Sequence, residues 1–97
     1  MKLRWMPAAQ SALDEIERYL IGQSSAALAR AEIERLIKAA EKIPHTPRMG
    51  RKVQPENRDD LRVVPVRPYW LYYRICPDAI EILLYWHYRL ERPKRLG

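Results

Sequence analysis

Arg67-Pro-Tyr-Trp-Leu-Tyr-Tyr-Arg74 is followed, after a short turn, by Ile80-Glu-Ile-Leu-Leu-Tyr-Trp-His87, and these two stretches decide the fold. Side chains of the first stretch alternate between two faces, as expected for a strand. One face carries Tyr69, Leu71, Tyr73 and Ile75, and the other carries Trp70, Tyr72 and Arg74. The second stretch is apolar on both faces except for Glu81, which is typical of a central strand. Together they predict an aromatic antiparallel hairpin.

The hairpin and the residue after it hold most of the aromatic side chains. The chain has 97 residues with 3 Trp, 6 Tyr and no Phe. Seven of these nine rings lie in this region, at Tyr69, Trp70, Tyr72, Tyr73, Tyr85, Trp86 and Tyr88. A chain of this length forms one small domain, here residues 1–97, with room for a single core of two packed layers. Function is therefore expected on the surface or in one shallow cleft.

Positive charge is concentrated in the second half of the chain. The sequence has 18 basic and 12 acidic residues; residues 1–43 carry 7 and 6 of them, and residues 44–97 carry 11 and 6. Such an excess favours acidic partners, which include nucleic acid, an anionic lipid surface and an acidic protein segment, without choosing between them. Residues 88–97 form a basic tail with cations at Arg89, Arg92, Lys94 and Arg95.

Several protein classes are disfavoured. The single cysteine, Cys76, excludes an internal disulfide and suggests a reducing compartment. We see no signal peptide and no apolar run long enough to span a membrane, so a cytoplasmic protein is expected. No Gly-rich phosphate loop, Cys/His metal cluster or nucleophile elbow occurs. We therefore expect neither a metal nor a cofactor.

Helical periodicity follows a short first strand at residues 2–6. Pro7 suits a first helical turn, an apolar stripe runs from Ala9 through Tyr19 to Leu20, and Gly22 ends the helix. Ser24 or Ser25 caps a second helix, which ends before Pro44. So short a connection predicts an antiparallel helical hairpin that packs on a sheet. The predicted fold is α+β in the order β-α-α-β-β-β, with the helical hairpin on a small, mainly antiparallel sheet.

The region between the helices and the aromatic hairpin reads as a loop and a strand. Residues 45–60 have little periodicity and several prolines, which predicts a long exposed loop. Residues 61–66 form a β-branched strand, and Pro65 places it at a sheet edge or a bulge.

The order and spacing of these segments resemble the RelE/ParE superfamily of bacterial type II toxins from Leu3 to Pro93. The matching pieces are the first helix, Pro44-x-x-Pro47-x-x-Gly50-Arg51, Leu61-Arg62-Val63, Tyr69-x-Leu71-x-Tyr73-Arg74, Ile80-x-Ile82-Leu83 and His87-x-x-x-x-Arg92-Pro93. The resemblance implies a labile antitoxin, encoded immediately upstream, that forms a hetero-oligomer with the toxin. One branch of the superfamily cleaves mRNA in the ribosomal A site, and the ParE-like branch poisons DNA gyrase.

Trp70 favours the ParE-like branch. In the ribonuclease branch a basic residue typically occupies this register, and an indole neither stabilises a phosphorane by charge nor transfers a proton usefully. His87-Tyr88 is the opposing signal, because it resembles the acid/base pair of some ribonuclease members. The alternative is therefore a metal-independent endoribonuclease that uses His87, Tyr88 and Arg67 together with Arg51 or Lys52.

We interpret the chain as a ParE-like toxin that binds DNA gyrase and works by contact, not by covalent chemistry. The residues expected to meet the target are His87, Arg89, Arg92, Lys94 and Arg95. The residues expected to meet the antitoxin are Trp70, Tyr72, Arg74, Tyr85 and Trp86, because one helical hairpin cannot cover both faces of the sheet. A simple basic nucleic-acid-binding domain is a third reading; for the toxin we expect no sequence-specific binding of nucleic acid.

Overall fold

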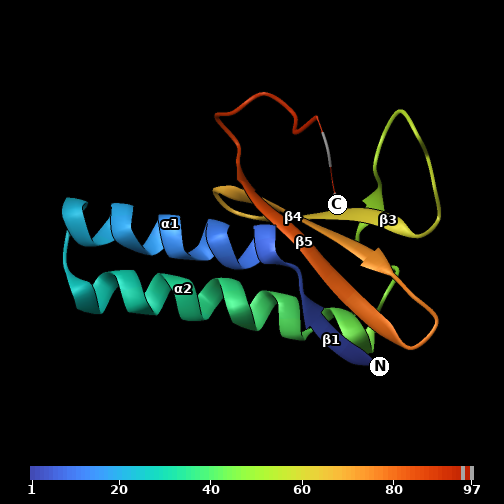
Figure 1. Ribbon diagram of the computed structural model, residues 1–97, viewed down its shortest axis with the longest axis horizontal. Coiled ribbons are helices and arrows are strands. Elements are labelled where there is room, and N and C mark those ends of the chain that lie inside the picture. The colour runs from blue at the N-terminus through green and yellow to red at the C-terminus, as the bar shows by residue number, and fades with distance from the viewer. Residues whose placement is uncertain (95, 97) are drawn as a thin grey trace.

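Two helices cover one face of a five-stranded sheet in the computed structural model, which describes residues 1–94 and 96 (Figure 1). The elements are β1 (Lys2–Trp5), α1 (Pro7–Gln23), α2 (Ala26–Glu41), the 3₁₀ turn η1 (Ile43–His45), β2 (Arg51–Lys52), β3 (Leu61–Val66), β4 (Tyr69–Ile75) and β5 (Ala79–His87). The strand order is β1-β5-β4-β3-β2. Only β1 and β5 run parallel, so the sheet is mixed and mainly antiparallel. The predicted α+β fold is confirmed.

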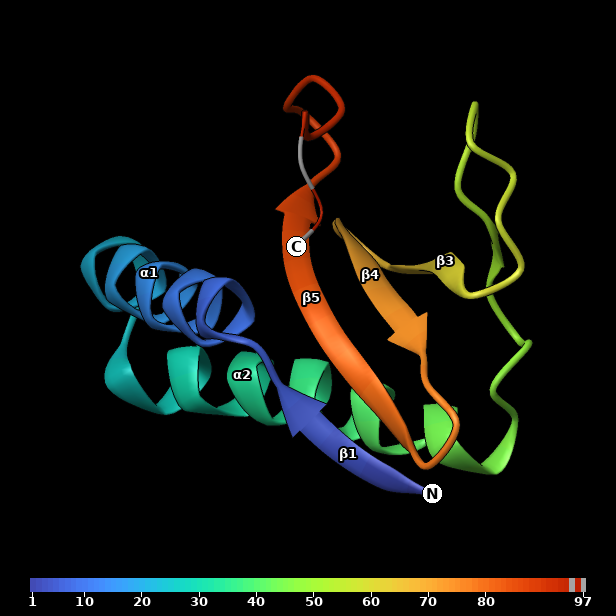
Figure 2. The same ribbon diagram turned by 45° about the vertical axis from the view of Figure 1, so that its right-hand side comes forward.

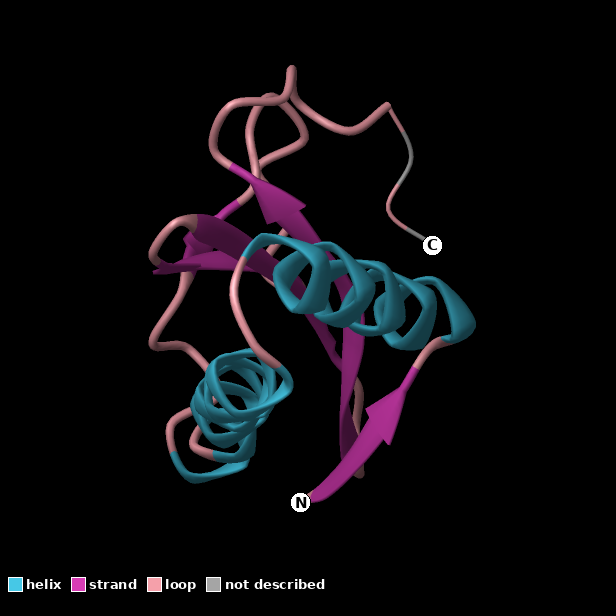
Figure 3. Ribbon diagram, turned by 90° about the vertical axis from the view of Figure 1, so that its left-hand side faces the viewer, coloured by secondary structure: helices cyan, strands magenta, loops and turns pink. Residues whose placement is uncertain are grey.

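The helical hairpin forms as predicted, except that Gly22 does not end the first helix: α1 continues to Gln23, and Ser24 is its C-cap. Pro7 occupies the first turn of α1, and the Ser25 hydroxyl accepts a hydrogen bond from the Leu28 N–H at 3.2 Å at the start of α2. Viewed from the helical side, both helices lie on the same side of the sheet (Figure 3). Tyr19 differs from the prediction: its side chain is 62% exposed, because the helices extend past the edge of the sheet (Figure 1).

Strand neighbours match the predicted environments. β5 lies between β1 and β4, as its two apolar faces indicated. On β3, only Arg62 and Val63 pair with β2, so Pro65 stands where the strand forms the edge of the sheet. Proline is tolerated there because it has no N–H to offer a neighbour.

A β-bulge interrupts the pairing of β5 with β4. Tyr72 is opposite Leu84 and Tyr73 is opposite Ile82, which leaves Leu83 as an extra residue. The alternation of side chains is thereby shifted by one. Ile82 faces the helices before the bulge, and Tyr85 faces them after it.

The predicted long loop at residues 45–60 is wrong in part, since this segment contains β2 and the buried Gly50 and Val53. The Tyr73 hydroxyl accepts from the Gly50 N–H at 2.9 Å and donates to the Pro47 carbonyl at 2.6 Å. Backbone groups that the sequence pattern left unassigned therefore find partners in a buried side chain.

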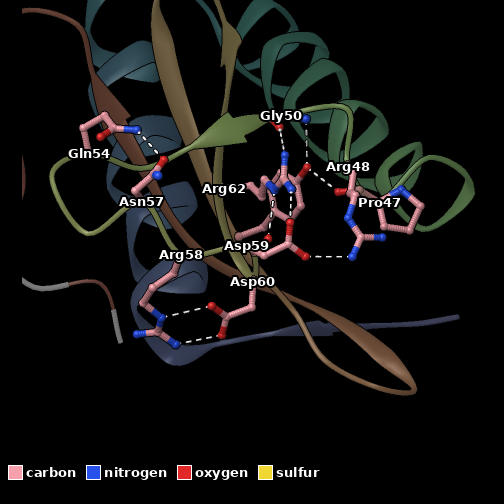
Figure 4. A network of polar contacts seen from close by, with 10 residues as sticks. Pro47, Arg48, Gly50, Gln54, Asn57, Arg58, Asp59, Asp60 and Arg62 are labelled. Carbon is pink, nitrogen blue, oxygen red and sulfur yellow. Dashed lines mark hydrogen bonds and ion pairs between the residues drawn. The ribbon is translucent and has the colours of Figure 1, made fainter.

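Arg62 fastens the same segment from β3 (Figure 4). Only 8% of this residue is exposed, and its guanidinium donates to the Gly50 carbonyl at 2.9 Å and to the Asp59 carboxylate at 2.7 Å. Arg48 also donates to Asp59 at 2.7 Å. Its guanidinium, with a smaller contribution from Arg62, holds the pKa of the Asp59 carboxyl below its ordinary value. Each nitrogen of the buried Arg62 guanidinium thus donates to an oxygen of Gly50 or Asp59.

Replacing Gly50 by alanine is expected to destabilise the fold. A Cβ at this position meets the Val63 carbonyl and the Tyr73 hydroxyl at 2.9 Å, so the backbone has to move. We expect the free energy of unfolding in urea to fall by about 1–3 kcal/mol. Gly22→Ala is the matched control: nothing lies within 4 Å of its added Cβ, and stability should rise by about 0.5 kcal/mol. Equal stability of the two variants would contradict this reading.

Tyr85→Phe tests the buried hydroxyl on β5. The Tyr85 side chain is 3% exposed and donates to the Leu36 carbonyl at 2.7 Å, so its loss should cost about 1 kcal/mol at neutral pH. Burial raises the pKa of Tyr85, so its contribution is full below the ordinary pKa of 10.0 and is lost as pH rises above it. The stability difference between wild type and variant should therefore shrink in alkali. Urea titrations on both sides of pH 10.0 measure it, and a constant difference would disprove the assignment.

Candidate functional site

The face of the sheet opposite the helices, called here the open face, carries its own apolar cluster. Its buried members are Val53, Leu61, Val63, Tyr72 and Leu83, and Met6, Trp70, Leu84, Trp86 and Leu96 pack against them. Trp70 lies at the surface of this cluster. The Arg51 guanidinium is 5.2 Å from one of its ring centroids, and the Tyr88 ring is 4.5 Å away with a tilt of 35°.

Two adjoining hollows, together called the open-face hollow, lie over this cluster. The first has a volume of about 560 Å³ and is lined by Arg51, Lys52, Trp70, Tyr72 and Arg92, among others. The second, of about 530 Å³, shares Arg92 and adds Arg58, Arg74 and Lys94. The segments that wall the hollow, between β2 and β3 and after β5, extend from the same end of the sheet (Figure 2).

The basic tail does not simply project past the last strand. The Trp86 indole donates to the Glu91 carbonyl, Arg74 donates to the Leu96 carbonyl at 3.4 Å, and Leu96 packs on the open face. This segment therefore lies over the sheet and places Arg92 and Lys94 at the open-face hollow. Arg89 is exposed in the turn after β5, and Arg95 lies outside the described residues.

His87 lies on the helix-facing side of β5. Its ring meets that of Tyr69 edge-on, with centroids 5.3 Å apart, and its Nδ1 accepts from the Arg89 N–H at 3.0 Å. A groove between α1 and β5 contains it. These two contacts fix the orientation of the imidazole.

The five residues of the ribonuclease alternative do not meet in one place. Arg51, Arg67 and Tyr88 border a hollow beside Trp70, and Lys52 borders the neighbouring one. His87 lines a separate groove between α1 and the end of β5. The cations Arg51, Lys52 and Arg67 therefore line neighbouring hollows that do not include the His87 imidazole.

Four of the five residues expected to meet the antitoxin belong to the open face, namely Trp70, Tyr72, Arg74 and Trp86. The expectation for Tyr85 is wrong, because the bulge turns its ring into the helix-facing core, where it stacks on Trp5 at 6.2 Å. Tyr72 is only 5% exposed and forms the floor of the open-face hollow. Arg74 is held by Glu81 at 2.9 Å.

The two edges of the sheet differ in what they offer another strand. The Lys2 N–H donates to the Asp78 carbonyl just before β5, and the Met6 N–H donates to the Ile82 carbonyl of β5. The alternation of backbone groups therefore directs the N–H groups of Leu3 and Trp5 away from the sheet. At the other edge, Pro65 removes the N–H that a new strand needs. The sequence marked Pro65 as an edge residue but did not identify β1 as the receptive edge.

Two kinds of feature are absent from residues 1–94 and 96. No helix there is long and apolar enough to cross a membrane. No group of three or more His, Cys, Asp or Glu side chains there is arranged to hold a metal ion.

The chain is similar to known toxins in sequence and in fold. Residues 3–89 match the family model described as the ParE toxin of the type II toxin–antitoxin system, parDE. No curated protein matches the chain significantly. A solved structure titled as the chromosomal ParDE TA system from P. aeruginosa superposes with a TM-score of 0.76 at 19% identity, covering 90% of this chain and 95% of that one. At this identity the match speaks for the fold, and the family model covers most of the chain. The chain belongs to the ParE toxin family of type II toxin–antitoxin systems.

Proposed function

We propose that this chain is a toxin that acts in the cytoplasm by binding DNA gyrase, and that a cognate antitoxin neutralises it in a hetero-oligomer. Membership of the ParE family supports the toxin role. The target-binding residues are His87, Arg89, Arg92, Lys94 and Arg95, which follow or end β5. Their action is contact with the enzyme, so that complexes of gyrase with cleaved DNA persist.

The separation of His87 from the cations carries this proposal over the ribonuclease alternative. Metal-free RNA cleavage needs a base near the 2′-OH and cations around the same phosphate. In this fold the Arg51 and Arg67 side chains border one hollow, whereas His87 lines a groove against α1. Trp70, whose ring contacts both Arg51 and Tyr88, occupies the register where the resemblance places a basic residue in ribonucleases.

Neutralising the tail should weaken inhibition of gyrase. In the variant Arg89→Gln/Lys94→Gln/Arg95→Gln we expect about tenfold more protein to be required for half-inhibition of DNA supercoiling, because three cationic contacts are lost. The control Arg18→Gln/Arg30→Gln/Lys38→Gln removes the same charge from exposed helical positions. It should stay within about twofold of wild type.

Two results would contradict the proposal. Wild-type protein that leaves supercoiling unchanged would remove the target. Cleavage of mRNA on translating ribosomes, abolished by His87→Ala, would establish the ribonuclease alternative. Inducing the chain in cells and measuring both mRNA cleavage and the response to broken DNA separates the two activities.

The antitoxin is proposed to bury an amphipathic helix on the toxin and to add a strand to β1. Trp70, Tyr72, Arg74 and Trp86 supply the open-face part of this interface. Exposed apolar side chains at the end of the helical hairpin, Tyr19, Ile21 and Leu28, are available to a helix. The outward backbone groups of Leu3 and Trp5 favour β1 over the edge that Pro65 blocks.

Amide exchange tests the choice of edge. The N–H groups of Leu3 and Trp5 point away from β5, so they should exchange rapidly in the free toxin and slowly in the complex, by at least about tenfold. Lys2 is the internal control, because its N–H already donates to the Asp78 carbonyl. Residue-resolved hydrogen exchange measures all three. Unchanged exchange at Leu3 and Trp5 in a formed complex would rule out strand addition at β1.

A further inference from the structure

The open-face hollow gathers more positive charge than its own carboxylates balance. Its lining includes the cations Arg51, Lys52, Arg58, Arg74, Arg92 and Lys94. Within residues 1–94 and 96, Glu56 is the one carboxylate in that lining. Arg58 and Arg74 are held by Asp60 and Glu81. Among residues 1–94 and 96, the other four cations form no ion pair.

The apolar floor strengthens the field of these cations. Tyr72, Val53 and Leu61 are buried beneath the hollow, and a low-dielectric wall concentrates the potential of charges around it. Burial raises the pKa of Tyr72, and Arg92 and Arg51 oppose that rise, so both guanidinium groups act at the same floor. An anion seated there would meet converging charges.

The shape suits a chain of anionic groups more than a single anion. Two hollows of about 560 and 530 Å³ adjoin through Val53, Gln54 and Arg92. Cations line both of them. Pro93 and Leu96 add apolar surface in the second hollow, which can receive the uncharged side chains of the same ligand.

We infer that the open-face hollow binds an extended acidic peptide segment of a partner protein. Single-stranded nucleic acid, the competing polyanion, binds through aromatic rings on which bases stack. Here the Trp70 ring is already contacted by Arg51 and Tyr88, and Tyr72 is 5% exposed. The carboxylates of an acidic peptide need only the cations of the hollow and no exposed ring for stacking.

The acidic segment belongs to the antitoxin, and this step rests on the proposed function. Arg92 and Lys94 belong both to the hollow and to the residues proposed to meet gyrase. A segment seated in the hollow therefore covers two target-binding cations. Neutralisation then follows from direct competition for the same side chains.

The test measures binding of fluorescein-labelled octaglutamate to the 97-residue chain by fluorescence anisotropy. Arg51→Gln/Lys52→Gln/Arg92→Gln should raise Kd by about tenfold. Arg18→Gln/Arg30→Gln/Lys38→Gln, with the same net charge, should change it by less than about twofold. Octaglutamine of equal length should not bind. Circular dichroism checks the fold of each variant; if the first triple variant unfolds, Arg92→Gln alone should still weaken binding by about threefold.

Three outcomes would overturn the inference. Equal weakening in the two triple variants would mean that net charge alone attracts the peptide. Tighter binding of an eight-residue oligothymidylate, with loss in the hollow variant, would make the site one for nucleic acid. Failure of wild type to bind octaglutamate would remove the site. Binding of octaglutamate by a chain that leaves gyrase unaffected would support the site and contradict the proposed function, so the two fail separately.

Discussion

One extra residue in β5 governs how the two faces of this protein are divided. Because Leu83 has no partner on β4, the strand enters the sheet with Ile80 and Ile82 toward the helices and leaves it with Tyr85 on that side. A slip of one position exchanges the faces of every later side chain. The bulge therefore sends the Tyr85 ring into the core and leaves Trp86 on the open face. The chain after β5 can then bond to Trp86 and cross the sheet.

Two buried polar side chains convert an irregular segment into a wall of the open face. The Tyr73 hydroxyl forms hydrogen bonds with Gly50 and Pro47, and the Arg62 guanidinium forms them with Gly50 and Asp59. Each satisfies backbone groups that would otherwise be costly to bury. They hold β2 in place, and with it Arg51 and Lys52. Buried hydrogen bonds thus position these two cations of the open-face hollow.

The two faces have different chemistry. The helix-facing side is occupied by packed rings and aliphatic chains, and it takes in His87 beside Tyr69. The open face combines buried apolar residues with six cations, of which four form no ion pair within residues 1–94 and 96. The His87 imidazole and these cations therefore line different hollows.

The sequence determined the elements: period-two alternation in residues 69–75, Pro7, Ser25 and the edge proline Pro65 are local signals that appear as predicted, and the helical stripes do so except at the exposed Tyr19. Only the tertiary structure decided which face Tyr85 takes, where the tail after Tyr88 lies, and that residues 45–60 are partly built into the sheet. Leu83-Leu84 and Tyr85-Trp86 are pairs of similar size and polarity, so either register buries a similar apolar area, and the pattern cannot reveal a bulge. Contacts across 23 residues, such as Tyr73 to Gly50, leave no local trace because they depend on where the sheet brings distant segments together.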